Sequence, residues 1–389
     1  MNFRTLLEQY KNNTICEEKK KLVEEELDKF SAISEYLEEE FQPDLTEEMP
    51  DFADEKAMQR VRRKINWRQI QLSFCVVVCV LVVLAGTSIL LDRVVFYDPN
   101  EGPVEETYGG DGQFYTDMMA LVEATMPGYT ISMATADKEG LGRYQMTVAF
   151  SDLCKGESER QQISLVRGNV DLWALQNMWK FPMGNAFGYY YHQFVTMEAD
   201  GTESYEQDES ERQYYQKGLS QLPDSTRAKL FVTFPEAISL EELAAFEQQY
   251  PDVDLLYAAV ENDDHQVVGF QTDTSGMILE NEYLKEQYPA LEMVWLEDSG
   301  LTQAQQWEAH YLDLMTYLSQ QEEFLDVFAD VNGLSAQTFG RRKAEAEETG
   351  IQVIGCLVTG RAPALTALLE EETFQSIYVD EIWLSLSTW

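Results

Sequence analysis

The chain has 389 residues and a formal net charge of −41, and its composition is 44% hydrophobic and 12% aromatic. This length exceeds that of one ordinary domain, and the apolar content excludes a chain that is disordered throughout. So acidic a surface repels the phosphate backbone of nucleic acids, which argues against a DNA- or RNA-binding protein.

Residues 1–43 carry two amphipathic patterns and are expected to form a two-helix head. The first pattern is short, and its apolar residues recur at i, i+3, i+4 and i+7: Phe3, Leu6, Leu7 and Tyr10. Thr14 and Glu17 then have the spacing of a capping box, in which the two side chains satisfy free backbone amides at a helix start. A second helix is therefore expected to begin there.

The second helix carries an apolar stripe several turns long, opposite a face of Glu and Lys. The members of this stripe are Val23, Leu27, Phe30, Ile33, Tyr36 and Leu37. Two helices of this size cannot bury their own apolar side chains, each of which contributes roughly 1.5–3 kcal/mol when buried. The stripes of both helices are therefore candidates for binding another protein. Self-association into a dimer and docking on a membrane surface stay open, although a Glu-rich polar face fits anionic lipid poorly.

An uncharged segment follows a linker, residues 44–69, that is first acidic and then basic. Within residues 70–92, the run Leu72–Leu91 contains no charged side chain. A helix rises about 1.5 Å per residue, so about 20 apolar residues cross a bilayer core of about 30 Å. The apolar core of a cleavable signal peptide would lie closer to the start of the chain. We expect one transmembrane helix here.

The flanking charges predict the orientation of this helix. Basic residues precede it at Arg60, Arg62, Arg63, Lys64 and Arg68, whereas only Arg93 follows it directly. The positive-inside rule then places the N-terminus in the cytoplasm and the C-terminus outside the cell. From Val94 onward, 15 basic residues stand against 51 acidic ones, a formal charge of −36. The acidic part of this single-pass protein of the cell membrane is therefore expected to be extracellular.

The part beyond the membrane segment is expected to be an α+β domain in pieces. Residues 93–113, acidic and rich in Gly and Pro, predict a flexible tether. Residues 114–195 form the first part, residues 196–227 a polar linker or loop, and residues 228–389 the second part. In the first part, a half-buried strand is predicted by alternating apolar residues: Tyr144, Met146, Val148 and Phe150.

Two strand–helix–strand units are predicted in residues 228–389. In the first, Leu230, Val232 and Phe234 alternate along a strand, Ser239 to Glu242 forms a capping box, and Asp254 to Val260 resumes a strand. In the second, a helix starts at Ser335 and ends at Gly350, followed by a strand over 351–359, a helix over 363–369 and a strand over 377–386. A long helix on Trp307, Tyr311, Leu314 and Leu318 lies between the units. This order predicts an α+β sandwich and is compatible with ferredoxin-like β-α-β units.

No sequence motif indicates catalysis or a cofactor. The chain has no G-x-S-x-G elbow, P-loop, H-E-x-x-H or dinucleotide fingerprint, and its cysteines have no zinc-site spacing. We therefore expect a protein that is not an enzyme and holds no cofactor or metal. Cys154 and Cys356 are the two cysteines that could pair outside the cell.

Two regions resemble a family of membrane-bound anti-sigma factors of Gram-positive bacteria. The head, FRTLLEQYKNNTICEEKKKLVEEELDKFSAISEYLEEEF, is similar to the sigma factor regulator N-terminal domain, although Asn12 and Asn13 stand where the family usually has Gly. The stretches KLFVTFPEAISLEELAAF, DLLYAAVE, VVGFQ and TGIQVIGCLVTGRAPALTALLE resemble the sigma factor regulator C-terminal domain. The resemblance implies that the cytoplasmic head binds an extracytoplasmic-function sigma factor and that the outer part responds to an unknown envelope signal.

A different function is also compatible with the sequence. A membrane-anchored binding module of the cell surface, with a head that has no transcriptional role, would have the same topology. For an anti-sigma factor, release of the partner by a conformational change and release by proteolysis near the tether are both open.

Overall fold

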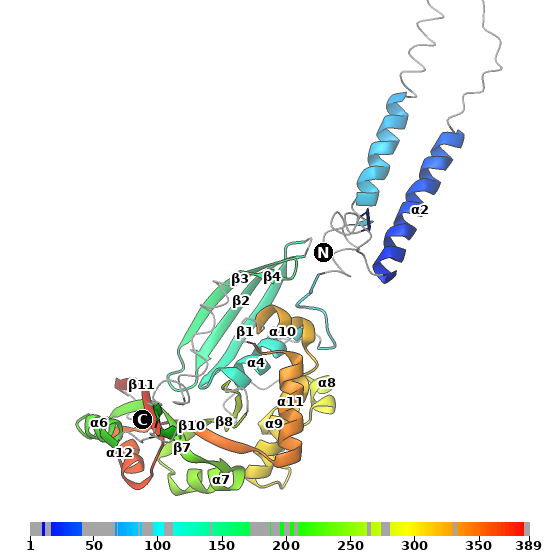
Figure 1. The fold of residues 1–389 in the computed structure, drawn as a ribbon. Helices are drawn as coiled ribbons and strands as arrows, with labels where there is room; N and C mark the ends of the chain where they lie inside the picture. The colour runs from blue at the N-terminus through cyan, green and yellow to red at the C-terminus, as the bar shows by residue number, and fades with distance from the viewer. Residues whose placement is uncertain are drawn as a thin grey trace, which may run out of the picture. The chain divides into compact units, whose positions relative to one another are not determined.

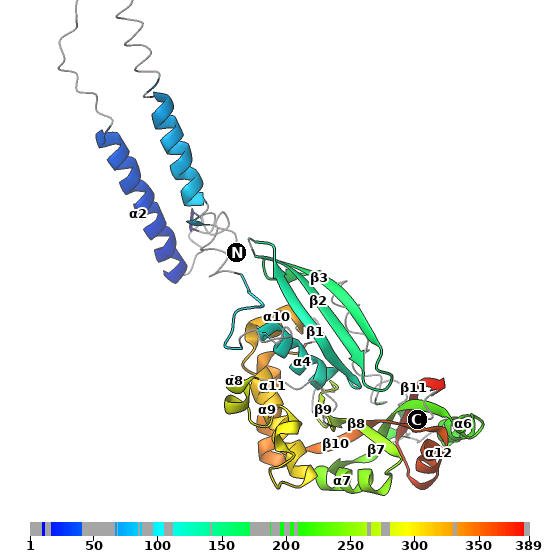
Figure 2. The same ribbon diagram turned by 180° about the vertical axis from the view of Figure 1, so that it is seen from behind.

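In the computed structural model, the described residues are 10–11, 17–40, 67, 69–84, 86–87, 96–104, 112–140, 142–171, 187, 195–197, 203–205, 209–262, 266–273, 281–329 and 333–384. The chain divides into two compact units, Met1–Val95 and Phe96–Trp389, called here the first and second units. Figures 1 and 2 show the elements of both units from opposite sides.

The first unit contains the helix α2, Glu17–Glu40, where a second helix is expected. Thr14, the first residue of the expected capping box, lies outside the described residues. Residues 10–11 and 69–84 are also helical. The predicted contact residues Phe3, Leu6 and Leu7, the side chain of Leu37 and most of the 44–69 linker lie outside the described residues.

Within the described part of the chain, none of the helices combines the length and the apolar character needed to span a membrane.

The first helix of the second unit packs against an antiparallel sheet (Figure 1). Helix α4 covers Gln113–Thr125, and the sheet has the order β1-β2-β3-β4. Its strands are β1 Tyr129–Lys138, β2 Arg143–Asp152, β3 Ser158–Val166 and β4 Asn169–Val170. In β2 the four alternating residues Tyr144, Met146, Val148 and Phe150 are buried, as predicted.

A second, five-stranded sheet has the order β11-β7-β10-β8-β9, with every neighbouring pair antiparallel. Its strands are β7 Thr226–Ser239, β8 Val253–Val260, β9 Gly269–Gln271, β10 Gln352–Arg361 and β11 Ser376–Leu384. Helix α7, Leu240–Gln249, connects β7 to β8, and α12, Ala362–Glu371, connects β10 to β11. Leaving out the edge strand β9, this is a β-α-β-β-α-β chain in the order fourth-first-third-second, the arrangement of a ferredoxin-like sheet.

A helical insertion separates β9 from β10. It consists of α8 Glu282–Gln287, the 3₁₀ helix η1 Met293–Leu296, α9 Gln303–Leu318, α10 Glu322–Phe328 and α11 Ala336–Thr349. Ser335 caps α11 through its side chain, and Gly350 ends it at φ 81°, as the sequence predicts. A left-handed φ is favourable for glycine, because other residues meet a Cβ clash there.

The stretch 196–227, predicted to be a polar linker or loop, contains regular structure. Strands β5, Val195–Met197, and β6, Glu203–Tyr205, pair with each other, and α6 covers Glu209–Ser220. The prediction of a linker or loop was wrong for α6. The helix is mostly polar, so its sequence lacks the long apolar stripe that would have indicated a packed helix. Its inner side is short: Leu219 is buried, and Tyr215 packs against the core.

The predicted flexible tether, residues 93–113, is in part a packed segment that we call the strap, residues 96–104. Asp98 pairs with Lys138 on β1 at 3.0 Å, and the side-chain amide of Asn100 donates to the carbonyl of Ala136 at 2.8 Å. Val104 is buried. Composition alone missed these contacts because their partners lie about 35 to 40 positions later in the chain.

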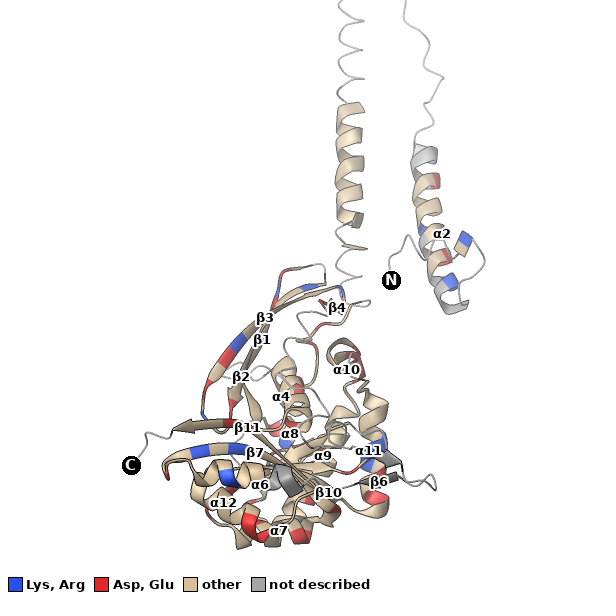
Figure 3. Ribbon diagram, turned by 60° about the vertical axis from the view of Figure 1, so that its left-hand side comes forward, with Lys and Arg blue, Asp and Glu red and all other residues tan. Residues whose placement is uncertain are grey.

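The second unit has two layers: α4 with the β1–β4 sheet, and the ferredoxin-like sheet with the helical insertion. One hydrophobic core extends through both layers and includes residues of α4, β1–β3, the ferredoxin-like sheet and the helical insertion. All residues of α4 are buried, because the helix contacts β1 as well as β9 and α9. The described parts of residues 114–171 and 209–384 therefore form one compact unit. Acidic residues are spread over many of its elements rather than gathered in one patch (Figure 3), so charge by itself does not mark a binding site.

Candidate functional surface and buried polar clusters

Helix α2 exposes large apolar side chains that the first unit leaves uncovered. The exposed fractions are 43% for Leu27, 74% for Phe30, 54% for Ile33 and 64% for Tyr36. Exposed aromatic and aliphatic side chains along successive turns are typical of a helix that binds another protein. We call these four residues the α2 stripe.

The predicted contact residue Val23 differs from the α2 stripe because its side chain is fully buried. The hydroxyl of Tyr10 donates to Oε1 of Glu24 at 3.2 Å, and Lys20 pairs with the same carboxylate at 3.8 Å. Residues 10–11 therefore lie beside this turn of α2. Val23 belongs to the packing of the first unit, and the surface open to a partner begins at Leu27.

In the second unit, three buried polar clusters connect α4 and the β1–β4 layer with the rest of the unit. The first, the Asp117 cluster, joins α4 to α9. The carboxylate oxygen Oδ1 of Asp117 accepts from the hydroxyl of Tyr317 at 2.6 Å and from the side-chain amide of Gln113 at 2.8 Å. Burial raises the pKa of Asp117 to about 7, although these two hydrogen bonds oppose the shift.

The second cluster, the His310 cluster, also joins α4 to α9. Nε2 of His310 lies 2.5 Å from Oε1 of Glu123, and Nδ1 donates to the carbonyl of Ala290, 3.0 Å away. Burial lowers the pKa of His310, but the charge and hydrogen bond of Glu123 outweigh it and raise the pKa above its ordinary value. Burial, with the charge of Glu123, raises the pKa of the neighbouring Glu292 to about 8.

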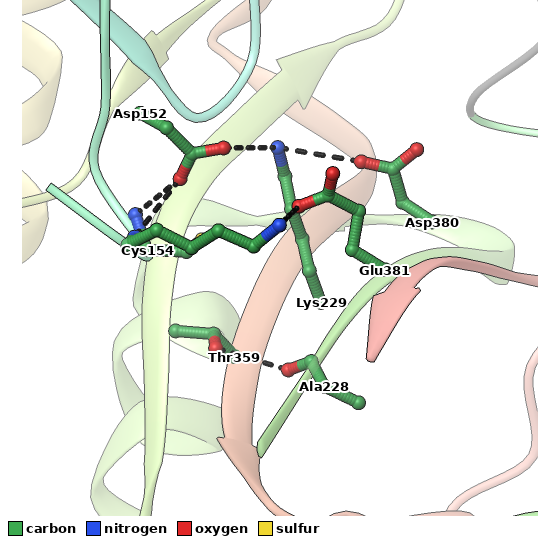
Figure 4. Close-up of polar contacts among 8 residues, drawn as sticks. Asp152, Cys154, Ala228, Lys229, Thr359, Asp380 and Glu381 are labelled. Carbon is green, nitrogen blue, oxygen red and sulfur yellow. Dashed lines mark hydrogen bonds and ion pairs between the residues drawn. The ribbon is translucent and has the colours of Figure 1, made fainter. Parts of the chain in front are cut away.

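The third cluster, the Lys229 cluster, joins the turn after β2 to the ferredoxin-like sheet (Figure 4). Lys229 on β7 has a fully buried side chain, and its Nζ lies 3.4 Å from Oδ2 of Asp380 and 3.7 Å from Oδ2 of Asp152. Burial raises the pKa of the nearby Cys154 thiol to about 12, which makes it a poor nucleophile at neutral pH.

Cys154 and Cys356, considered as a pair in the sequence, are both free thiols. Cys356 belongs to the main core, whereas Cys154 packs against the smaller cluster that contains Leu357. Successive residues of a strand point to opposite faces of a sheet, so the two thiols lie on different faces of β10. The structure therefore shows no disulfide between them.

No residue of the three buried clusters was among the predicted site residues. Each cluster joins residues far apart in the sequence, as in the pair Glu123 and His310, so no local motif indicates it. Within the described ranges, no three His, Cys, Asp or Glu side chains are grouped as metal ligands.

Comparison with known families adds a finding to this geometry. Residues 219–381 match the sigma factor regulator C-terminal family. The match supports an anti-sigma factor. It begins near the end of α6 and ends in β11, so the matched domain is the ferredoxin-like sheet together with its helical insertion. Searches among curated proteins and among solved structures returned no match.

The matched range contains all four C-terminal stretches on which the resemblance rested in the sequence. The resemblance of this part is therefore confirmed, and it supports a role in transcription regulation with a sigma factor as partner. The match leaves out α2 and the β1–β4 layer. The resemblance of the head to a sigma factor regulator N-terminal domain stays a prediction.

Proposed function

We propose that the protein is a single-pass transmembrane anti-sigma factor that sequesters an extracytoplasmic-function sigma factor through its cytoplasmic head. The observation that carries the proposal is the match of residues 219–381 to the sigma factor regulator C-terminal family. The α2 stripe supports it, because an exposed apolar helix face needs a partner to cover it. The uncharged run Leu72–Leu91 and the basic residues before it support the membrane topology.

In this proposal the second unit lies outside the cell and responds to an envelope signal. The strap connects the proposed membrane segment to α4, and α4 is buried between the β1–β4 layer and the matched domain. A change in the packing of the second unit would therefore reach the chain that enters the membrane. Appearance of a free head fragment during the response would identify proteolytic release, and an intact chain would identify a conformational mechanism.

The proposed partner is tested by copurification from membranes. A variant with Leu27→Asp and Phe30→Asp places two charges in the α2 stripe, and we expect it to lose the sigma factor that copurifies with the wild-type chain. A matched control, Lys21→Glu, makes the same change in net charge at an exposed position away from the α2 stripe. The control should keep the partner.

The copurification experiment also tests the alternative function. If no sigma factor accompanies the wild-type chain, and deletion of residues 1–43 leaves transcription unchanged, the protein is a surface binding module instead. If both variants bind the sigma factor as the wild type does, the α2 stripe is not the contact surface.

A further inference from the structure

Lys229 combines complete burial with an apolar and aromatic surrounding. Its side chain has 0% exposure and sits on β7, inside the ferredoxin-like sheet. Its Nζ lies 4.6 Å from the centroid of the Tyr129 ring and 6.0 Å from that of Phe231. Removing an amine and its carboxylate partners from water costs several kcal/mol per charged group, which their mutual attraction offsets only when the geometry is good.

Two carboxyl groups approach this amine from different layers of the second unit. Oδ2 of Asp380, on the edge strand β11, is 3.4 Å from Nζ, and Oδ2 of Asp152, at the end of β2, is 3.7 Å away. Figure 4 shows the amine between the two carboxyl groups. Asp380 occupies the position where the register between β11 and β7 shifts. The bulge there places its side chain beside Lys229.

The two carboxyl groups are held differently. Oδ1 of Asp152 accepts hydrogen bonds from the backbone amides of Cys154 at 2.7 Å and Lys155 at 3.1 Å. These bonds fix the carboxyl group and direct its other oxygen toward Lys229. For Asp380, burial raises the pKa, with the charge of Lys229 opposing the shift, and burial thereby favours the neutral acid. A neutral carboxylic acid is a far better acceptor for an attacking amine than a carboxylate.

We propose that Lys229 and Asp380 are joined by an intramolecular isopeptide bond, with Asp152 as the group that moves the proton. A buried amine, a partly buried carboxyl group as acceptor and a second carboxyl group that is buried and fixed are the parts that this condensation needs. They are held in place by the fold, so the bond forms after folding and needs no other enzyme.

The reaction balances without a cofactor. The ammonium of Lys229 first gives a proton to the carboxylate of Asp380, which leaves a neutral amine and a neutral acid. The amine attacks Cγ of Asp380 and forms the new C–N bond. Asp152 takes a proton from the attacking nitrogen and returns it to the hydroxyl group, which leaves as water when the C–O bond breaks. The products are one amide and one water molecule, and Asp152 ends as it began.

The bond would connect the edge strand β11 covalently to β7. It would close a long loop that contains the whole helical insertion, and such a cross-link stabilises a fold mainly by restricting the unfolded chain. The cysteines of the described ranges are all free, so no disulfide supplies this function there.

Mass spectrometry of the full-length chain tests the bond directly. The wild-type protein, purified from membranes and unfolded in denaturant with a reductant, should have a mass lower than that of its sequence by one water molecule. Peptide mapping should find one branched peptide that joins Lys229 to Asp380. The measurement involves no sigma factor, so its failure would leave the proposed function untouched.

Three variants separate the bond from a simple ion pair. Lys229→Arg keeps the positive charge and should show the full sequence mass, and Asp152→Ala should do the same although both joined residues are present. Glu381→Gln changes the neighbouring acid, which pairs with Lys155 at 2.6 Å, and should keep the loss of water. A wild-type chain with its full sequence mass would reduce the cluster to a buried ion pair and overturn the proposal. A branch at Asp152 would overturn the assignment of Asp380.

Discussion

Glu123 on α4 and His310 on α9 share a short polar contact, with Oε1 and Nε2 2.5 Å apart, in the buried seam between the two helices. Glu292 lies close enough to interact with both, and Asp117 is buried one to two turns before Glu123 on the same helix. Residues of this seam come from the α4 layer and from the matched domain. The seam therefore holds the part that follows the strap against the rest of the second unit.

The stability of the second unit should fall as pH rises. The pKa of Asp117 is about 7 and that of Glu292 about 8, both far above the ordinary values of carboxyl groups, and the pKa of His310 is also raised. Each group binds its proton more tightly in the folded state, so its stabilising contribution is present at low pH and is lost as pH rises through the folded pKa. We expect the thermal midpoint of the full-length protein to decrease between pH 5.5 and pH 8.5. The free energy of unfolding should fall by an amount on the order of a few kcal/mol over the same range.

Substitutions in the seam should flatten this pH dependence. Asp117→Asn keeps an oxygen that can accept from Tyr317 but removes the titrating carboxyl group. Glu292→Gln removes the titrating carboxyl group at the second position. Glu297→Gln, at an exposed position, is the matched control and should leave the slope unchanged. If Asp117→Asn and Glu292→Gln kept the slope of the wild type, the pH dependence would arise elsewhere.

The sequence predicted the elements whose signals are local. The capping box of Ser239 and Glu242 forms as expected, and so do the helix ends at Ser335 and Gly350. Side chains that cap a helix act on backbone groups within three residues, so a single stretch of sequence contains the whole interaction. Strand β2 was predictable for the same reason, because alternation is a property of one strand.

Features that depend on distant partners could not be predicted. Lys229 occupies a position in β7 where a charged residue suggests exposure, yet it is fully buried because Asp152 and Asp380 reach it from other elements. Helix α6 and the strap have polar or Gly- and Pro-containing sequences, and only tertiary contacts order them. The stripe on α2 was predicted from its spacing, but the burial of Val23 was not.

Phe187 should be essential for the smaller hydrophobic cluster of the second unit, which also contains Phe231 and Tyr257. Its ring is fully buried, edge-to-face with Phe231 at 5.3 Å and stacked with Tyr257 at 6.4 Å between centroids, and its carbonyl accepts from the hydroxyl of Thr233 at 2.6 Å. Phe187→Ala should lower the free energy of unfolding by about 3–5 kcal/mol, because it leaves a cavity. Tyr214→Ala, at a side chain that is 73% exposed, should change it by less than about 0.5 kcal/mol. Thermal unfolding of the three proteins measures the difference, and a small effect at Phe187 would contradict its role as an anchor.

Phe30 and Tyr10 should differ in what they contribute to the head. Phe30 is 74% exposed, so Phe30→Ala should weaken binding of the sigma factor by about 2 kcal/mol or more and leave the helicity of the head unchanged. Tyr10→Phe removes the hydrogen bond to Glu24, which should cost the head about 1 kcal/mol of stability and leave affinity close to that of the wild type. Titration of the partner and circular dichroism separate the two effects. Loss of affinity in Tyr10→Phe with none in Phe30→Ala would reverse the assignment.

The proposed topology makes a prediction about reporter fusions on the two sides of residues 70–92. Alkaline phosphatase folds only outside the cytoplasm, so a fusion after Gln113 should be active and one after Phe41 inactive. The basic residues between Arg60 and Arg68 should set this orientation, because positively charged segments resist translocation. Replacing all five with Gln should therefore lower the activity of the fusion after Gln113 and raise that of the fusion after Phe41. High activity at both positions in the unsubstituted chain would show that residues 70–92 do not cross the membrane, and the head could not then meet a sigma factor.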